Sequence, residues 1–160
     1  MNHYAAFIRG INVGGVVLKM DKLKEIFTGL GFAGVETYIQ SGNVIFGTTE
    51  QDENALEARI SNQIRIETGL DVAVLVRSKK EMEQITAVHP FWNMDNKKGL
   101  YITLLKDTPP EGHSLSKTDA ANEMFLLKGR TIFSYYGDGY GRSKHDNNYF
   151  ERIWKIPATT

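Results

Sequence analysis

The chain has 160 residues and no cysteine, which excludes disulfides and cysteine chemistry. Its 19 basic residues balance 19 acidic ones, so it has no long-range electrostatic attraction to nucleic acid or anionic lipid. This length and a hydrophobic share of 41% suit one compact globular domain. No apolar run approaches the roughly 20 residues that cross a bilayer, and no secretory signal pattern opens the chain, so we expect a cytoplasmic protein with no membrane association.

The first 77 residues predict the element order β-α-β-β-α-β, which is that of a ferredoxin-like unit. Apolar residues at i, i+3, i+4 and i+7 predict the first helix, and a repeat of four predicts the second. The middle strands flank Ser41-Gly42, a composition suited to a tight antiparallel hairpin. The first strand, Tyr4 to Arg9, is so continuously apolar that we expect burial on both faces. The predicted elements lie near residues 4–9, 21–30, 35–40, 43–47, 54–69 and 72–76.

The remaining sequence predicts a connecting helix and then a second unit. The connecting helix falls within residues 78–98, because Ser78 and Glu81 have the spacing of a capping box and His89-Pro90 stops the helix. Residues 99–160 repeat the order β-α-β-β-α, with elements near 99–105, 116–122, 124–128, 131–136 and 146–155. Only residues 156–160 remain for a final strand, so this unit is expected to be incomplete at its C-terminal end.

These patterns together predict an α+β fold. We expect two ferredoxin-like units in tandem, residues 1–77 and 99–160, with mostly antiparallel sheets covered by helices. The two units and the connecting helix are expected to form one compact domain overall.

Polar and glycine residues gather where the first and third strands should meet. In a ferredoxin-like unit these strands are antiparallel neighbours, so the end of one lies beside the start of the other. The loop after the first strand and the turn before the third would then share one rim of the sheet. Amide, hydroxyl, guanidinium and backbone N–H donors in one place suit a small anionic or phosphorylated ligand. The candidate rim residues are Arg9, Asn12, Gly14, Gly15, Lys19, Gln40, Ser41 and Asn43.

A purely structural role for the same residues stays open. Glycines permit positive φ in turns and asparagines cap turns, whether or not a ligand binds. Arg9 ends an apolar strand, so it is either paired within the fold or reaches solvent as a ligand clamp. Arg142, Ser143 and Lys144 could extend the anion site, because they stand close to the start of the last helix. Ser143 also suits a helix cap.

Known nucleotide and catalytic motifs are incomplete in this chain. Gly10 and Gly15 reproduce the first half of a phosphate-binding loop, but Val16 stands where that loop needs its lysine. Residues 143–146 include serine, histidine and aspartate, the types of a hydrolytic triad, but neighbours in one turn point in different directions. The histidines show no i, i+4 pair, and we expect neither a metal ion nor a cofactor.

Five phrases, "YAAFIRGINVGG", "LKMDKLKEIFTGLGF", "TYIQSGNVIF", "GYGRSK" and "IPATT", together resemble the bacterial domain of unknown function family 1697, in the same order over residues 4–160. The resemblance implies a duplicated ferredoxin-like fold in a small cytoplasmic bacterial protein, with no established activity. Members of that family usually continue after Pro-Ala-Thr-Thr with an Arg-Asn-Trp phrase and a last helix. Any site residue on such a tail is therefore expected to be missing here.

Two classes of function follow for the rim. The preferred one is binding of a small anionic or phosphorylated ligand. The alternative is an enzyme that uses the same donors as an oxyanion or phosphate clamp, for which the nearest titratable groups in sequence are Lys19, Tyr38 and Asp138. Nucleic-acid binding on an open sheet face is disfavoured by the neutral charge, and the basic runs at 77–80 and 97–98 are typical of solvated surface. A monomer and a homodimer both remain open.

Overall fold

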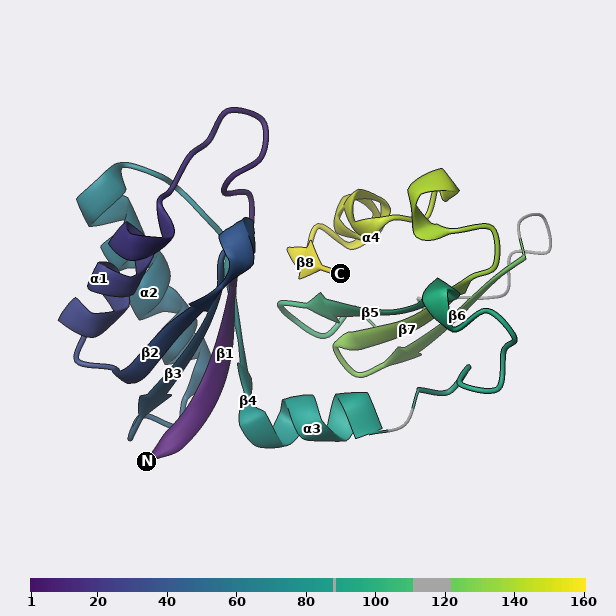
Figure 1. Cartoon of the computed structure of the whole chain (residues 1–160), viewed down its shortest axis with the longest axis horizontal. Helices are drawn as coiled ribbons and strands as arrows, with labels where there is room; N and C mark the ends of the chain where they lie inside the picture. The colour runs from purple at the N-terminus through teal and green to yellow at the C-terminus, as the bar shows by residue number, and fades with distance from the viewer. Residues whose placement is uncertain (88, 111–121) are drawn as a thin grey trace. The chain divides into compact units, whose positions relative to one another are not determined.

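The computed structural model describes residues 1–87, 89–110 and 122–160. These residues divide into two compact units, Met1–Glu83 and Gln84–Thr160, each built on a four-stranded antiparallel sheet (Figure 1). The short helix predicted near residues 116–122 lies almost entirely outside the described residues. No helix in the described ranges is long and apolar enough to cross a membrane.

The first unit has the predicted order β-α-β-β-α-β. Its elements are β1 (Asn2–Ile8), α1 (Met20–Gly29), β2 (Ala33–Tyr38), the 3₁₀ turn η1 (Ile39–Ser41), β3 (Asn43–Thr48), α2 (Glu53–Thr68) and β4 (Val74–Ser78). The strands lie in the order β2-β3-β1-β4. The first and third strands are therefore antiparallel neighbours, as predicted, with Phe7 opposite Asn43. The next helix, α3 (Lys79–Ala87), begins with one half of the predicted capping box: Ser78 Oγ accepts from the Glu81 N–H at 3.2 Å, whereas the Ser78 N–H donates to Glu53 and not to Glu81.

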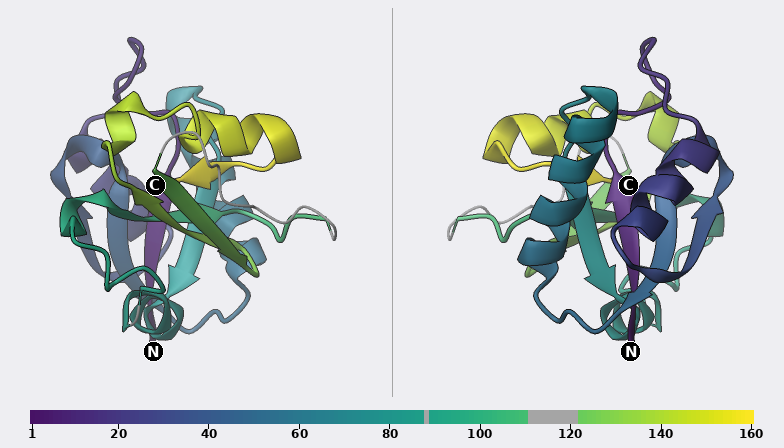
Figure 2. Two further views of the ribbon diagram at one scale, coloured as in Figure 1. Left: turned by 90° about the vertical axis from the view of Figure 1, so that its right-hand side faces the viewer. Right: turned by 90° about the vertical axis from the view of Figure 1, so that its left-hand side faces the viewer.

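Helices α1 and α2 lie side by side over one face of the first sheet (Figure 2). Their apolar stripes face the sheet because the helical period places those residues on one side. The fully buried helix residues are Leu23, Ile26, Phe27, Leu56, Ile60 and Ile64. They pack against Tyr4, Ala6, Ile8, Val44 and Phe46 of the strands. The predicted helical periodicity is thus confirmed by the core itself.

The opposite face of the first sheet is covered only in part. Ala5 and Phe7 are half-buried, and Ile45, which lies opposite Ala5, is 51% exposed. The prediction that the first strand is buried on both faces is therefore wrong. Its apolar run alternates, as a strand in a one-sided core does, between the helix-covered face and this more open one. By contrast, residues 74–77 of β4 are all buried.

The edge of the first sheet at β4 is closed by two carboxylates of α2. Glu57 accepts from the Val76 N–H at 2.8 Å, and Glu53 accepts from the Ser78 N–H at 2.8 Å. These alternate N–H groups point away from β1, and they would otherwise offer a template for another strand. A carboxylate pair one helical turn apart therefore protects this edge.

The second unit repeats the strand order of the first. Its elements are η2 (Lys97–Gly99), β5 (Leu100–Leu105), β6 (Glu123–Lys128), β7 (Thr131–Tyr136), η3 (Tyr140–Arg142), α4 (Asn147–Trp154) and β8 (Ala158–Thr159). The strands lie in the order β6-β7-β5-β8. The fourth strand, β8, has only 2 residues and pairs with the end of β5, where Ala158 lies opposite Leu105.

An aromatic core holds the second unit together. Phe150 and Trp154 of α4 are buried, and Asp146 caps the helix by accepting from the Tyr149 N–H at 2.9 Å. Ile153 of the same helix is 37% exposed. The other buried members of this core are Leu105, Phe125, Ile132, Tyr136 and Ala158.

Candidate functional site

The predicted rim residues gather at one end of the first sheet. There the loop of residues 10–19 leaves the end of β1, and η1 connects β2 to β3 (Figure 1). The Ile8 N–H donates to the Gly42 carbonyl at 2.9 Å, which joins the two segments directly. The residues predicted for the rim between Arg9 and Asn43 thus share one end of one unit.

Asn12 connects the loop after β1 to the segment between β2 and β3 through hydrogen bonds. Its side-chain amide donates to the carbonyls of Leu18 and Gln40, both at 3.1 Å, and its Oδ1 accepts from the Leu18 N–H at 3.0 Å. Its backbone is left-handed, with φ 58°, a conformation that asparagine tolerates better than most residues. Both amide hydrogens of Asn12 are engaged by the protein backbone, so this side chain positions the loop.

The loop glycines leave the surface of the rim open. Gly14 and Gly15 have φ of 59° and 87°, and a Cβ at either position would meet no atom within 4 Å. Gly42 differs, because a Cβ there would lie 2.7 Å from Ile11 Cδ1 and 3.0 Å from the Ile8 carbonyl oxygen. Gly42 is therefore required by close packing, whereas Gly14 and Gly15 are required by the turn alone.

The charged and polar rim side chains differ in exposure. Lys19 is exposed and stands at the start of α1, where its side chain makes no capping hydrogen bond. Arg9 is half-buried and is engaged within the fold. Gln40 and Ser41 are exposed, and Ser41 Oγ donates to the Tyr38 carbonyl at 3.2 Å. Asn43 is half-buried at the start of β3.

Large apolar side chains surround these polar groups, which the sequence patterns did not predict. Val13 and Val17 of the loop are 59% and 74% exposed, and Tyr38 and Ile39 beside η1 are 66% and 65% exposed. Ile39 also has φ 45°, an unusual backbone conformation for a β-branched residue. The signal in the sequence was the Val-Gly-Gly-Val-Val run, in which apolar residues stand inside a turn-forming loop.

The Arg142–Lys144 cluster belongs to the second unit. Arg142 ends η3 and is exposed, as is Lys144. Ser143 Oγ accepts from the His145 N–H at 2.9 Å, a turn within the loop before α4, so the helix-cap role considered for Ser143 is wrong: Asp146 caps that helix.

His145 pairs with a carboxylate that sequence reasoning missed. Its Nδ1 lies 2.8 Å from Oε2 of Glu123, which is only 6% exposed. The two residues are distant in sequence, and the pairing of Glu123 with Tyr136 at the end of β7 brings them together. The Tyr136 hydroxyl donates to the His145 carbonyl at 2.8 Å, and burial raises the pKa of that hydroxyl above its usual value. His145 therefore belongs to a partly buried hydrogen-bond network of the second unit.

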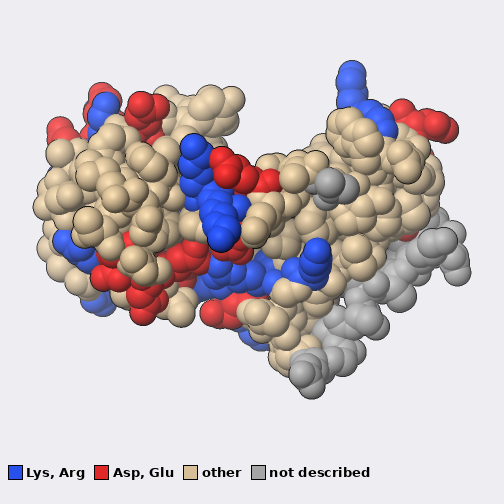
Figure 3. Space-filling model, turned by 90° about the horizontal axis from the view of Figure 1, so that it is seen from below, with Lys and Arg blue, Asp and Glu red and all other residues tan. Residues whose placement is uncertain are grey.

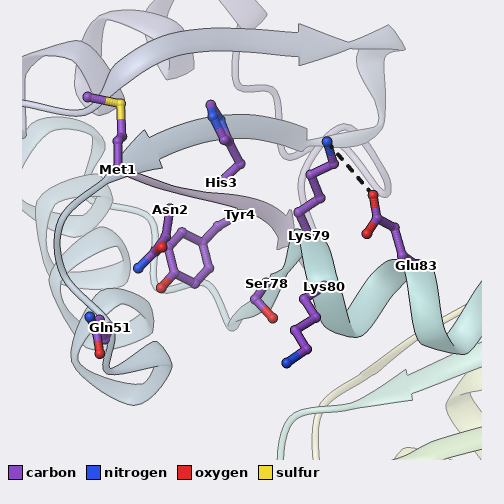
Figure 4. A pocket seen from close by; sticks show the side chains of 9 residues that line it. All are labelled: Met1, Asn2, His3, Tyr4, Gln51, Ser78, Lys79, Lys80 and Glu83. Carbon is purple, nitrogen blue, oxygen red and sulfur yellow. Dashed lines mark ion pairs between the residues drawn. The ribbon is translucent and has the colours of Figure 1, made fainter.

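A pocket of about 560 Å³ lies at the other end of the first sheet, where β1 begins and β4 ends (Figure 4). Lys79 is paired there with Glu83 at 3.8 Å, and the Tyr4 hydroxyl donates to the Glu50 carbonyl at 2.9 Å. The basic run 77–80 contributes the exposed Lys79 and Lys80 to the lining, but its interpretation as solvated surface is wrong for Arg77, which is fully buried. The full lining consists of Met1, Asn2, His3, Tyr4, Gln51, Ser78, Lys79, Lys80 and Glu83.

Charged side chains of both signs are mixed on the surface. On the face drawn in Figure 3, small groups of Lys and Arg adjoin groups of Asp and Glu. Such mixing is consistent with the balance of 19 basic and 19 acidic residues. Among the described residues, no three His, Asp or Glu side chains are placed to hold a metal ion.

Two units with the same strand order define a duplicated ferredoxin-like α+β protein. The chain belongs to the family described as "Protein of unknown function (DUF1697)", whose model matches residues 1–133. This confirms the family resemblance, which the first three phrases carry within the matched residues, whereas "GYGRSK" and "IPATT" lie beyond them.

A solved structure supports the same fold. The conserved bacterial protein SP0830 from Streptococcus pneumoniae is 21% identical to this chain with a TM-score of 0.71, and the match covers 99% of this chain and 92% of that one. At this identity the likeness concerns the fold alone. A search of curated proteins found no match.

Proposed function

We propose that this protein binds a small anionic or phosphorylated ligand at the rim of the first sheet. The observation that carries the proposal is the set of Asn12 hydrogen bonds, which hold the glycine loop against the β2–β3 connection. A loop that is already held in place loses less conformational entropy when a ligand binds. The open approach over Gly14 and Gly15 then lets an anion reach the backbone.

The charges of the rim favour an anion of low charge. Lys19 adds a cation at the start of α1, where the helix dipole is also positive. Arg9 adds a second cation, half-buried beside the loop. Asp21, in the first turn of α1, opposes them in part. We therefore expect a single phosphate or carboxylate group to be preferred over a polyphosphate.

The test is a titration of the full-length ¹⁵N-labelled protein with inorganic phosphate and with phenyl phosphate, at constant ionic strength. We expect saturable shifts of the backbone amide signals of Gly14, Gly15 and Lys19. Lys19→Ala should weaken binding severalfold because it removes an exposed cation from the rim. Lys24→Ala is the matched control, since Lys24 is an exposed lysine of the same helix. Shifts that do not saturate, or equal affinities of Lys19→Ala and wild type, would contradict the proposal.

A further inference from the structure

We infer that the first unit has a second binding site, for a small amphipathic anion, on the open face of its sheet. The site consists of an apolar trough that ends at a cationic pocket. It lies at the end of the sheet away from the rim, so it is independent of the function proposed above.

The apolar part is a pocket of about 500 Å³. Its floor is formed by Ala5 of β1 and Ile45 of β3, which lie directly opposite each other on the more open face. Ile45 is 51% exposed, and Met82 of α3 forms another part of the lining. An exposed apolar surface on central strands is unfavourable in water, so an apolar group that covers it would be stabilised.

The polar part is the pocket of about 560 Å³ drawn in Figure 4. The two pockets adjoin each other, because His3, Tyr4 and Lys79 line both. His3 and Lys79 extend to the same side of β1 (Figure 4). Lys80 adds a second lysine to the lining of the polar part.

The charge of the polar part favours an anionic head group. The lining of the polar part carries two lysines, Lys79 and Lys80, and one carboxylate, that of Glu83. The Lys79–Glu83 pair is weak, because both side chains are about two-thirds exposed, at 68% and 66%. A carboxylate or phosphate of a ligand can therefore replace Glu83 as the partner of Lys79 at little cost. Ser78 Oγ already caps α3, so the start of that helix is not what recognises the anion.

Size and topology exclude a peptide strand as the occupant. Both volumes fall in the range of about 300–1,000 Å³ that is typical of small-molecule sites. An added β-strand needs an unpaired sheet edge, but β1 and β3, which form the floor of the trough, are internal strands of the sheet. The occupant that fits is a small molecule with an apolar chain and one anionic group.

The proposal is tested by calorimetric titration of the full-length protein with decanoate below its micellar concentration. Decyltrimethylammonium, which has a similar chain and the opposite charge, is the comparison. We expect decanoate to bind saturably and the cation to bind at least tenfold more weakly. Ile45→Asp, which places a like charge in the trough, and Lys79→Glu should each weaken decanoate binding by about tenfold. Lys24→Glu, a charge reversal on an exposed lysine of α1, should leave it unchanged.

Thermal melts decide whether each variant is folded, and Ile45→Thr replaces Ile45→Asp if the aspartate unfolds the protein. The proposal is overturned if decanoate does not saturate the wild-type protein, if the cation binds equally well, or if folded Ile45 and Lys79 variants bind like the wild type. Sedimentation velocity provides a further test. A dimer that forms through this face and that decanoate does not dissociate would assign the trough to a second copy and would also overturn the proposal.

Discussion

Asn12 shows how one side chain can organise a candidate site through hydrogen bonds to the backbone. It makes three hydrogen bonds to the backbone, and it occupies a left-handed conformation. An asparagine suits both requirements, because its amide is short enough to reach nearby backbone groups and its backbone tolerates positive φ. The Asn12 amide therefore has the turn-forming role considered for it.

We predict that Asn12→Ala lowers the free energy of unfolding by about 1–3 kcal/mol, because the Leu18 and Gln40 groups lose their partner and alanine disfavours positive φ. Asn12→Gly is the matched control, since glycine accepts the conformation but makes none of the bonds. Urea denaturation should give the order wild type, Asn12→Gly, Asn12→Ala. If both variants are as stable as the wild type, the side-chain bonds do not hold the loop in solution.

At the scale of the element, the edge strand β4 depends on α2. Glu57 is 1% exposed, accepts from the Val76 N–H, and lies 3.9 Å from the guanidinium of Arg77, which is fully buried. Removing Glu57 would leave the Val76 N–H without its acceptor and would take away one of the two carboxylates, Glu57 and Glu81, near the buried guanidinium of Arg77, which is costly.

We therefore predict that Glu57→Ala destabilises the protein by roughly 3–5 kcal/mol. Glu57→Gln should cost less, because its amide oxygen can still accept from the Val76 N–H. Chemical denaturation gives the free energy of unfolding of both variants, and hydrogen exchange of the β4 amides shows whether the loss of stability lies in β4. Equal stability of Glu57→Ala and Glu57→Gln would show that this hydrogen bond does not matter for the edge strand.

At the scale of the whole molecule, the repeat of one strand order in two units indicates that each unit carries its own core. The buried cluster of the first unit is drawn entirely from residues 4–76. Residues beyond this cluster still contribute, because the Ser78 N–H donates to Glu53 and Arg77 Nε lies 3.4 Å from Glu81.

This predicts that a fragment of residues 1–87 folds on its own. A fragment of residues 1–77, the first unit as delimited from the sequence, should fold less stably because it lacks Ser78 and α3. Circular dichroism during urea titration measures the unfolding transition of each fragment. A fragment 1–87 that shows no cooperative transition would mean that the second unit is needed for the first to fold.

The sequence by itself determined the features that depend on local periodicity and on general topology. The stripe of Leu23, Ile26 and Phe27 predicts a helix with one buried face because residues three and four apart share a side. The order β-α-β-β-α-β predicts that β1 and β3 are neighbours, which places Phe7 opposite Asn43. The hairpins follow from turn composition in the same way, although the first of them turns through η1 and Gly42 rather than through two residues alone.

Only the tertiary structure decided how these elements use their surfaces. Whether the second face of β1 is covered depends on what packs on it, and an apolar run cannot show that. The partners of Asn12 and of His145 lie far away in the chain, at Gln40 and at Glu123. Such contacts arise where two segments meet in space, and the spacing of residues along one segment holds no information about the other.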